Sequence, residues 1–187
     1  LNEAMSASGD ICEFGCSHGA STALFANEIL ETQKHLWIYD SFEGLSKPTE
    51  KDVLIDDIAN LGSIDKYQGE MAHPKERVLS RLTKVGFPLP RTHVIPGFIE
   101  KTSQTGPLPE EISFAYIDFD FYEPIKIGLD LIKDRLNPKG IIMVDDYGYF
   151  SEGAKIAVDE FVSEQKGKFI LEHIPSWGGK CVVVRPT

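Results

Sequence analysis

The stretches Ala-Tyr-Ile-Asp-Phe-Asp at residues 115–120 and Ile-Ile-Met-Val-Asp-Asp at residues 141–146 decide the fold of this chain. Each is an apolar run of the length of a buried strand that ends abruptly in aspartates. If the two strands are neighbours in one sheet, their ends bring these carboxylates together at one edge. Crowded carboxylates raise each other's pKa unless a cation neutralises them. The pattern therefore predicts a divalent ion with oxygen ligands. The alternative is that the second aspartate pair caps a following helix while the first pair faces water.

Strands alternate with helices on both sides of these two stretches, which supply the fourth strand (112–117) and the fifth strand (140–144). The other expected strands lie at residues 10–15, 36–39 and 93–95, and the expected helices at 21–31, 76–85, 125–136 and 154–164. Such alternation predicts a mainly parallel sheet with helices on both faces.

The tail departs from this alternation. Residues 169–171 and 181–184 are β-rich runs joined through Trp177-Gly178-Gly179, which is a hairpin signal. We therefore expect one domain over residues 1–187 with an α/β, Rossmann-like, doubly wound fold. Its mainly parallel seven-stranded sheet would end in a C-terminal antiparallel hairpin.

The composition excludes several classes of protein. Lys and Arg total 19 against 29 Asp and Glu, and the resulting net charge of −10 argues against nucleic acid as a partner. No apolar run approaches the length of a membrane span. The three cysteines, Cys12, Cys16 and Cys181, are expected to be reduced, buried thiols in a cytoplasmic protein. The sequence leaves a homo-oligomer open.

Residues 43–74 form a long polar stretch that Gly and Pro residues interrupt, with only Val53-Leu54-Ile55 and Ile58 as a short helical patch. A stretch of this length without a clear element is uncommon in a compact domain and is often functional. We expect a lid or a substrate-recognition insertion here. The alternative is a disordered surface loop.

Residues 13–19, Glu-Phe-Gly-Cys-Ser-His-Gly, lie where the first strand turns into the first helix. Ligands of open α/β sheets bind beyond the carboxyl ends of the strands, next to such turns. Ser17 stands where a dinucleotide-binding fingerprint has its second glycine, which disfavours close approach of a pyrophosphate. Glu13 would also repel a phosphate, but it could accept hydrogen bonds from an ammonium group. The turn therefore favours an uncharged or cationic ligand.

Asp40 ends the second strand about 20 residues beyond the glycine turn. A carboxylate at this position binds the ribose hydroxyls of adenosine-containing cofactors. The alternative is that Asp40 caps a turn. Together with the glycine turn and the aspartate-tipped strands, Asp40 describes an S-adenosylmethionine-dependent methyltransferase better than a dehydrogenase.

Five short motifs in order along the chain resemble the macrocin O-methyltransferase (TylF-type) family. They are Glu13-x-Gly15-x-x-x-Gly19, residues 39–45 (Tyr-Asp-Ser-Phe-Glu-Gly-Leu), Pro96-Gly97-Phe98, residues 116–123 (Tyr-Ile-Asp-Phe-Asp-Phe-Tyr-Glu) and residues 144–148 (Val-Asp-Asp-Tyr-Gly). The resemblance implies a class I methyltransferase fold and methyl transfer from S-adenosylmethionine to a hydroxyl. It also implies a sugar-like small-molecule substrate and a magnesium ion in the site.

The resemblance also implies roles for individual residues. Those expected to bind the cofactor are Glu13, Gly15 and Gly19 on the methionine side, Asp40 and Ser41 at the ribose, Gly97 and Phe98 at the adenine, and Ser17 and Ser21 beside the glycine turn. The expected metal ligands are Asp118, Asp145 and Asp146.

The base that takes the proton from the hydroxyl is expected to be Asp118, Asp120 or His18, in that order. Related methyltransferases that act on catechols have a lysine where this chain has Phe121, so a catechol-type lysine base is disfavoured. Two other functions remain as alternatives. One is an aspartate-dependent phosphohydrolase, and the other is a domain that binds S-adenosylmethionine without turnover.

Overall fold

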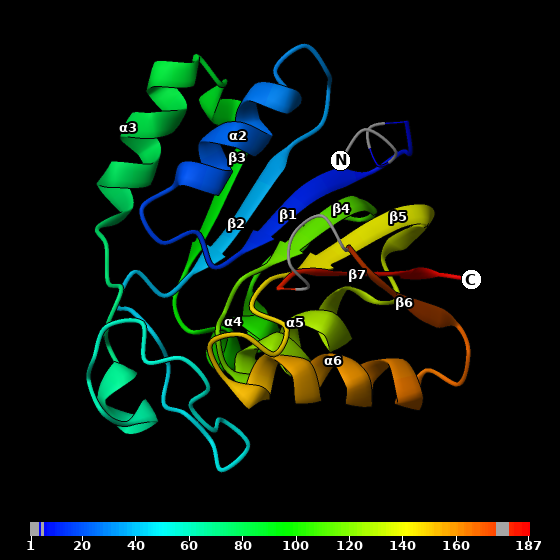
Figure 1. The fold of residues 1–187 in the computed structure, drawn as a ribbon. Coiled ribbons are helices and arrows are strands. Elements are labelled where there is room, and N and C mark those ends of the chain that lie inside the picture. The colour runs from blue at the N-terminus through cyan, green and yellow to red at the C-terminus, as the bar shows by residue number, and fades with distance from the viewer. Residues whose placement is uncertain (1–3, 5, 175–179) are drawn as a thin grey trace.

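The computed structural model describes residues 4, 6–174 and 180–187, and a seven-stranded sheet forms its centre (Figure 1). The strands are β1 (Asp10–Phe14), β2 (Leu36–Asp40), β3 (Thr92–Pro96), β4 (Ile112–Ile117), β5 (Leu136–Val144), β6 (Phe169–His173) and β7 (Val182–Pro186). Their order in the sheet is β3-β2-β1-β4-β5-β7-β6. Strands β1 to β5 are parallel, and β7 runs antiparallel to both β5 and β6. The predicted mainly parallel sheet with a terminal antiparallel pair is confirmed.

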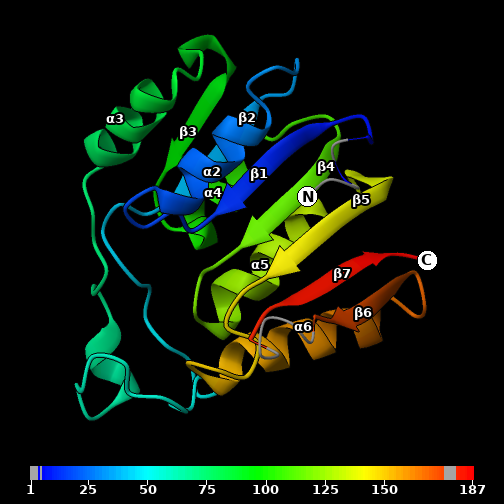
Figure 2. The ribbon, with the colours of Figure 1, turned by 45° about the horizontal axis from the view of Figure 1, so that its top comes forward.

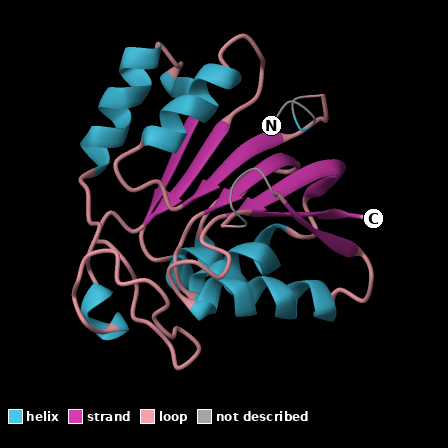
Figure 3. Ribbon diagram, viewed as in Figure 1, coloured by secondary structure: helices cyan, strands magenta, loops and turns pink. Residues whose placement is uncertain are grey.

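Helices cover both faces of this sheet (Figures 1 and 3). The helices α2 (Ala20–Glu28) and α3 (Lys75–Val85) lie on one face, and α4 (Ile99–Thr105), α5 (Tyr122–Ile132) and α6 (Glu152–Glu164) lie on the other. Figure 2 shows the strands fanning between the two helical layers. This doubly wound arrangement places the carboxyl ends of β1, β2, β4 and β5 at one edge of the sheet.

Alternating side chains on the strands build a separate core on each face. On β1, Ile11 packs with α2 and α3, whereas Cys12 and Phe14 pack in the core under α5 and α6. Because side chains alternate between faces, Glu13 points to the α2 side, where it is fully buried. The strand that builds the core thus also carries a carboxylate to the site.

The structure corrects three local predictions. The helix expected to reach residue 136 ends at Ile132, because Leu136 instead pairs with Ile112 and begins β5. Helix α4, which follows β3, was not predicted. The helical patch expected around Leu54 is wrong, since that residue forms a β-bridge with Ser151. The predicted hairpin turn at 177–179 lies outside the described residues.

Residues 43–74 fold against the rest of the domain. Tyr67, from the short 3₁₀ helix η1 (Ile64–Tyr67), packs with Phe121 and Phe150 in a small apolar cluster. The buried carboxylate of Asp52 accepts a hydrogen bond of 2.7 Å from the Tyr122 amide at the start of α5. The segment is therefore anchored near the carboxyl edge of the sheet.

None of the helices that the structure describes has the length and apolar character of a membrane span.

Candidate active site

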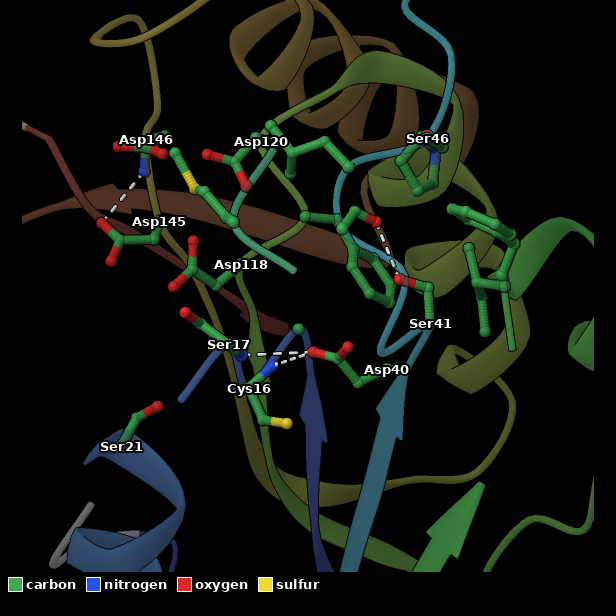
Figure 4. A pocket seen from close by; sticks show the side chains of 18 of the residues that line it. Cys16, Ser17, Ser21, Asp40, Ser41, Ser46, Asp118, Asp120, Asp145 and Asp146 are labelled. Atoms are coloured by element: carbon green, nitrogen blue, oxygen red, sulfur yellow. Dashed lines mark hydrogen bonds between the residues drawn. The ribbon is translucent and has the colours of Figure 1, made fainter. Parts of the chain in front are cut away.

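A pocket of about 460 Å³ opens at the carboxyl edge of the sheet. It lies where β1 and β4 meet and where the strand order reverses, which is the usual ligand position in open α/β folds. The glycine turn, the end of β2, the start of α4 and the ends of β4 and β5 contribute to its wall. Figure 4 shows the aspartates of β4 and β5 on one side of this pocket and Asp40 with Ser41 on another.

The glycine turn is held closely against the end of β4. Gly15 has a φ of 85°, and a Cβ on it would lie 1.9 Å from the Asp118 carbonyl oxygen. Any side chain at this position would therefore push the turn away from β4. Gly19 has a φ of 83° and faces Val78 and Arg81 of α3 rather than the pocket. Gly15, which lines the pocket, thus serves both chain packing and ligand access, whereas Gly19 serves the packing of the turn against α3.

Asp40 ties the glycine turn to the end of β2. Its Oδ2 accepts hydrogen bonds from the Cys16 amide at 2.7 Å and the Ser17 amide at 3.2 Å. Its Oδ1 accepts one from the Phe42 amide at 2.7 Å. Asp40 therefore caps the turn after β2, as the alternative interpretation held, and it lines the pocket at the same time.

Glu13 lies beneath the pocket wall and contacts it through Ser21. The Ser21 hydroxyl, which lines the pocket, donates a hydrogen bond of 2.5 Å to Glu13 Oε1. Glu13 Oε2 is buried without a hydrogen-bond partner among the described residues. Burial raises the pKa of Glu13 from 4.5 to about 7.

Three carboxylates converge at the ends of β4 and β5. Oxygens of Asp118, Asp120 and Asp146 lie within 4.8 Å of one another. Burial, together with repulsion from the neighbouring aspartates, raises the pKa of both Asp118 and Asp120 well above the usual range. The same causes raise the pKa of Asp146 to about 6. The charge of Lys180 offsets this repulsion only in part, at Asp146. The three carboxylates match the oxygen donor set that magnesium prefers.

An unusual backbone conformation orients the side chains of two of these aspartates. Asp120 and Asp146 have φ values of 64° and 56°, in the left-handed region that residues other than glycine seldom adopt. Neither Asp145 nor Asp146 caps α6, because the Ser151 hydroxyl accepts the Gly153 amide hydrogen bond at that helix start. The alternative in which the second pair serves only as a helix cap is therefore wrong.

Asp145 lies beside the group but has other partners. Its Oδ1 accepts hydrogen bonds from the Cys181 thiol at 2.6 Å and the Asp146 amide at 2.9 Å. Its Oδ2 accepts a short hydrogen bond from the Tyr116 hydroxyl, which also lies 3.3 Å from Asp118 Oδ2. Asp145 lines the pocket, although its two oxygens are already engaged by protein donors.

The structure brings most of the predicted site residues into one pocket. Those that line it are Gly15, Ser17, His18, Ser21, Asp40, Ser41, Phe98, Asp118, Asp120, Asp145 and Asp146. Glu13, Gly19 and Gly97 do not line it. Gly97 instead donates its amide hydrogen bond to the Asp40 carbonyl at 2.9 Å and so joins the ends of β2 and β3.

Sequence reasoning missed two polar groups in the pocket wall. Ser46 Oγ and Glu100 Oε2 are buried and have no hydrogen-bond partner in the described structure. Glu100 belongs to α4, the helix that the sequence did not predict. Ser46 belongs to the 43–74 segment, which also supplies Leu45, Ile58 and Met71 to the wall. The glycines and prolines of that segment gave no signal for these contacts.

Solved structures of methyltransferases share this fold. The O-methyltransferase NovP superposes with a TM-score of 0.79 at 22% identity, covering 98% of this chain and 74% of NovP. The calicheamicin methyltransferase CalS11 superposes with a TM-score of 0.72 at 22% identity, covering 99% of this chain and 74% of CalS11. At these identities the likeness concerns the fold alone.

Two curated relatives are each 27% identical to this chain over 143 residues. One is the 8-demethyl-8-(2,3-dimethoxy-alpha-L-rhamnosyl)-tetracenomycin-C 4'-O-methyltransferase of Streptomyces olivaceus, and the other is the mycinamicin III 3''-O-methyltransferase of Micromonospora griseorubida. Each alignment covers 74% of this chain but only 53% and 55% of the relatives, so the chain spans about half their length.

The family model described as macrocin-O-methyltransferase (TylF) matches residues 3–183. That match covers nearly the whole chain and includes the glycine turn, Asp40 and both aspartate-tipped strands. The chain therefore belongs to the macrocin O-methyltransferase (TylF) family.

Proposed function

We propose that this chain is an S-adenosylmethionine-dependent, magnesium-dependent O-methyltransferase that methylates a hydroxyl on a sugar of a small molecule. The observation that carries the proposal is that the carboxylate group of β4 and β5 shares one pocket with the glycine turn and Asp40. Membership in the TylF family supports methyl transfer. The names of the two curated relatives, both sugar-linked O-methyltransferases, support the substrate class.

The polar groups of the pocket fit an adenosine cofactor. Asp40 ends β2 at the position of a ribose-binding acid, and Ser41 follows it. The unpartnered Ser46 Oγ and Glu100 Oε2 lie on the same wall and need hydrogen-bond donors or acceptors that a ligand would supply. We therefore add Ser46 and Glu100 to the proposed cofactor-binding residues.

The donor set also fits magnesium. We propose Asp118, Asp120 and Asp146 as the metal ligands, in place of the predicted set that contained Asp145 and not Asp120. The mutual distance within 4.8 Å supports this set. Asp145, engaged by Tyr116 and Cys181, would instead hold the end of β5 in place.

Bound there, magnesium would lower the pKa of a substrate hydroxyl and so favour an oxyanion near neutral pH. The chain's own residues would hold that oxygen in line with the methyl group and exclude water. Asp118 and Asp120 belong to the metal-binding group, which leaves His18 as the proposed base. Desolvation and the neighbouring Arg81 and Arg77 lower the pKa of His18, so its ring is uncharged at neutral pH and can accept a proton.

Labelled S-adenosylmethionine with a panel of glycosylated and phenolic acceptors tests this function. We expect label transfer to a glycosylated acceptor in magnesium, none in EDTA, and at least a hundredfold loss for Asp118→Asn. Calorimetry should show cofactor binding by both proteins. No cofactor binding by the wild type, or full transfer in EDTA, would contradict the proposal.

A further inference from the structure

A group of basic side chains lies beside the pocket on the α3 side. The ring centroids of His18 and His73 are 5.7 Å apart, and Arg77 Nη1 lies 3.5 Å from His73 Nδ1. Arg81 lies over the glycine turn, since a Cβ on Gly19 would be 3.3 Å from its Cδ. His73, Arg77 and Arg81 therefore form a basic rim next to His18, which itself lines the pocket.

The two guanidinium groups of this rim have no anionic partner among the residues that the structure describes. The other arginines of the chain, Arg91, Arg135 and Arg185, donate to backbone carbonyls or to a carboxylate. Among the described residues, the Arg81 side chain makes no hydrogen bond or ion pair, and the Arg77 guanidinium group has a polar contact only with the His73 ring. These two arginines have no carboxylate partner although the chain carries 29 Asp and Glu against 19 Lys and Arg. They leave a fork of N–H donors open to a ligand.

The positive charge of the rim contrasts with the negative charge of the aspartate side of the pocket. That side carries Asp118, Asp120, Asp145 and Asp146, which repel anions. A ligand that is neutral at one end and anionic at the other would fit both surfaces. The N-terminus of α2, where Ala20 and Ser21 line the pocket, would offer amide donors to the carboxylate of the proposed cofactor. The rim is therefore available to a second ligand.

We propose that His73, Arg77 and Arg81 bind an anionic group, a phosphate or carboxylate, on the methyl acceptor. The acceptor class would then be an anionic sugar, such as a sugar phosphate or a nucleoside diphosphate sugar. Its hydroxyl would face the aspartates while its anionic end contacts the rim. This inference rests on the proposed function, because it takes the aspartate pocket as the place of methyl transfer.

Inorganic pyrophosphate, titrated in EDTA, tests the rim without depending on turnover or on a bound metal. The variant is Arg77→Gln/Arg81→Gln, and the matched control is Lys84→Gln, an exposed cation in the last turn of α3. Each protein is titrated with and without saturating S-adenosylhomocysteine. Separate titrations with S-adenosylhomocysteine report the cofactor site by itself, and circular dichroism reports the fold.

The wild type and the Lys84→Gln control should bind pyrophosphate equally, and the double variant at least tenfold more weakly, because charge-assisted hydrogen bonds are lost. Binding should persist with S-adenosylhomocysteine present and weaken with added salt. Equal affinity in all three proteins, or no binding by the wild type, would overturn the inference. Displacement of pyrophosphate by S-adenosylhomocysteine would also overturn it, since the rim would then belong to the cofactor. If the wild type does not bind S-adenosylhomocysteine, that result would instead contradict the proposed function.

Discussion

Asp120→Asn should make the metal-free protein more stable while it abolishes stabilisation by magnesium. The substitution keeps the shape of the side chain and removes one charge from the group that lies within 4.8 Å. Asparagine tolerates the left-handed backbone of residue 120, where φ is 64°. The hydrogen bond from the Ser151 hydroxyl to the backbone carbonyl of residue 120 is also retained.

The size of the effect follows from the charge spacing. Two unit charges 4.8 Å apart repel by about 3.5 kcal/mol at an effective dielectric constant of about 20. Protonation relieves part of this repulsion, as the raised pKa of Asp120 shows. We therefore expect the free energy of unfolding of metal-free Asp120→Asn to exceed that of the wild type by about 2 kcal/mol. For a chain of this size, that difference raises Tm by about 4–8 °C.

Thermal unfolding in EDTA and in magnesium measures both effects. At a magnesium concentration about 100 times Kd, the wild type should gain about 2.7 kcal/mol, while the variant gains almost nothing. On adding magnesium, the Tm difference between the variant and the wild type should therefore vanish or change sign. Asp134→Asn removes an exposed aspartate and serves as the control, which should follow the wild type in both buffers. A lower Tm for Asp120→Asn in EDTA, or an equal magnesium response in the two proteins, would refute the reasoning.

Three further predictions concern the walls of the pocket. Burial raises the pKa of Glu13 from 4.5 to about 7, so the folded state keeps a proton that the unfolded chain releases. Glu13 should therefore account for a loss of about 3 kcal/mol of stability as pH rises through this window. In urea titrations, Glu13→Gln should reduce the pH slope by that amount, while the raised pKa values of Asp118, Asp120 and Asp146 keep the rest of the slope. Gly15→Ala should cost more than about 3 kcal/mol, because its Cβ would lie 1.9 Å from the Asp118 carbonyl, whereas Gly62→Ala, with open space at φ 85°, should cost about 1 kcal/mol. His18→Gln should lower kcat at least tenfold and remove the acidic limb of the pH–rate profile, with cofactor affinity unchanged by calorimetry.

The sheet could be predicted because each strand is a compact apolar run and strands alternate with helices. The expected parallel order of the strands then determined which strand ends lie at the same edge of the sheet. Helix α4 was missed because Ile99 is its only buried residue, and one apolar position sets no helical period. The start of β5 was missed because its first residues include an exposed proline and lysine, which read as a turn. Short elements held by tertiary contacts leave little trace in local sequence.

The convergence of aspartates at one edge was also predictable, since β4 and β5 are neighbouring parallel strands. Which three of them form a group was not, because Asp145 and Asp146 are adjacent in sequence and only the backbone at residue 146 turns one toward Asp120. The contacts of Tyr116 and Cys181 with Asp145 join residues far apart in the chain. Such pairings depend on register, which the hydrophobic pattern alone does not give.

The most direct test of the central claim is a crystal structure of the protein with S-adenosylhomocysteine and Mn²⁺, in which anomalous scattering locates the metal. We predict an anomalous peak coordinated by Asp118, Asp120 and Asp146, with the ribose of the cofactor at Asp40. A peak at another place in the protein, or a cofactor bound outside this pocket, would contradict the account.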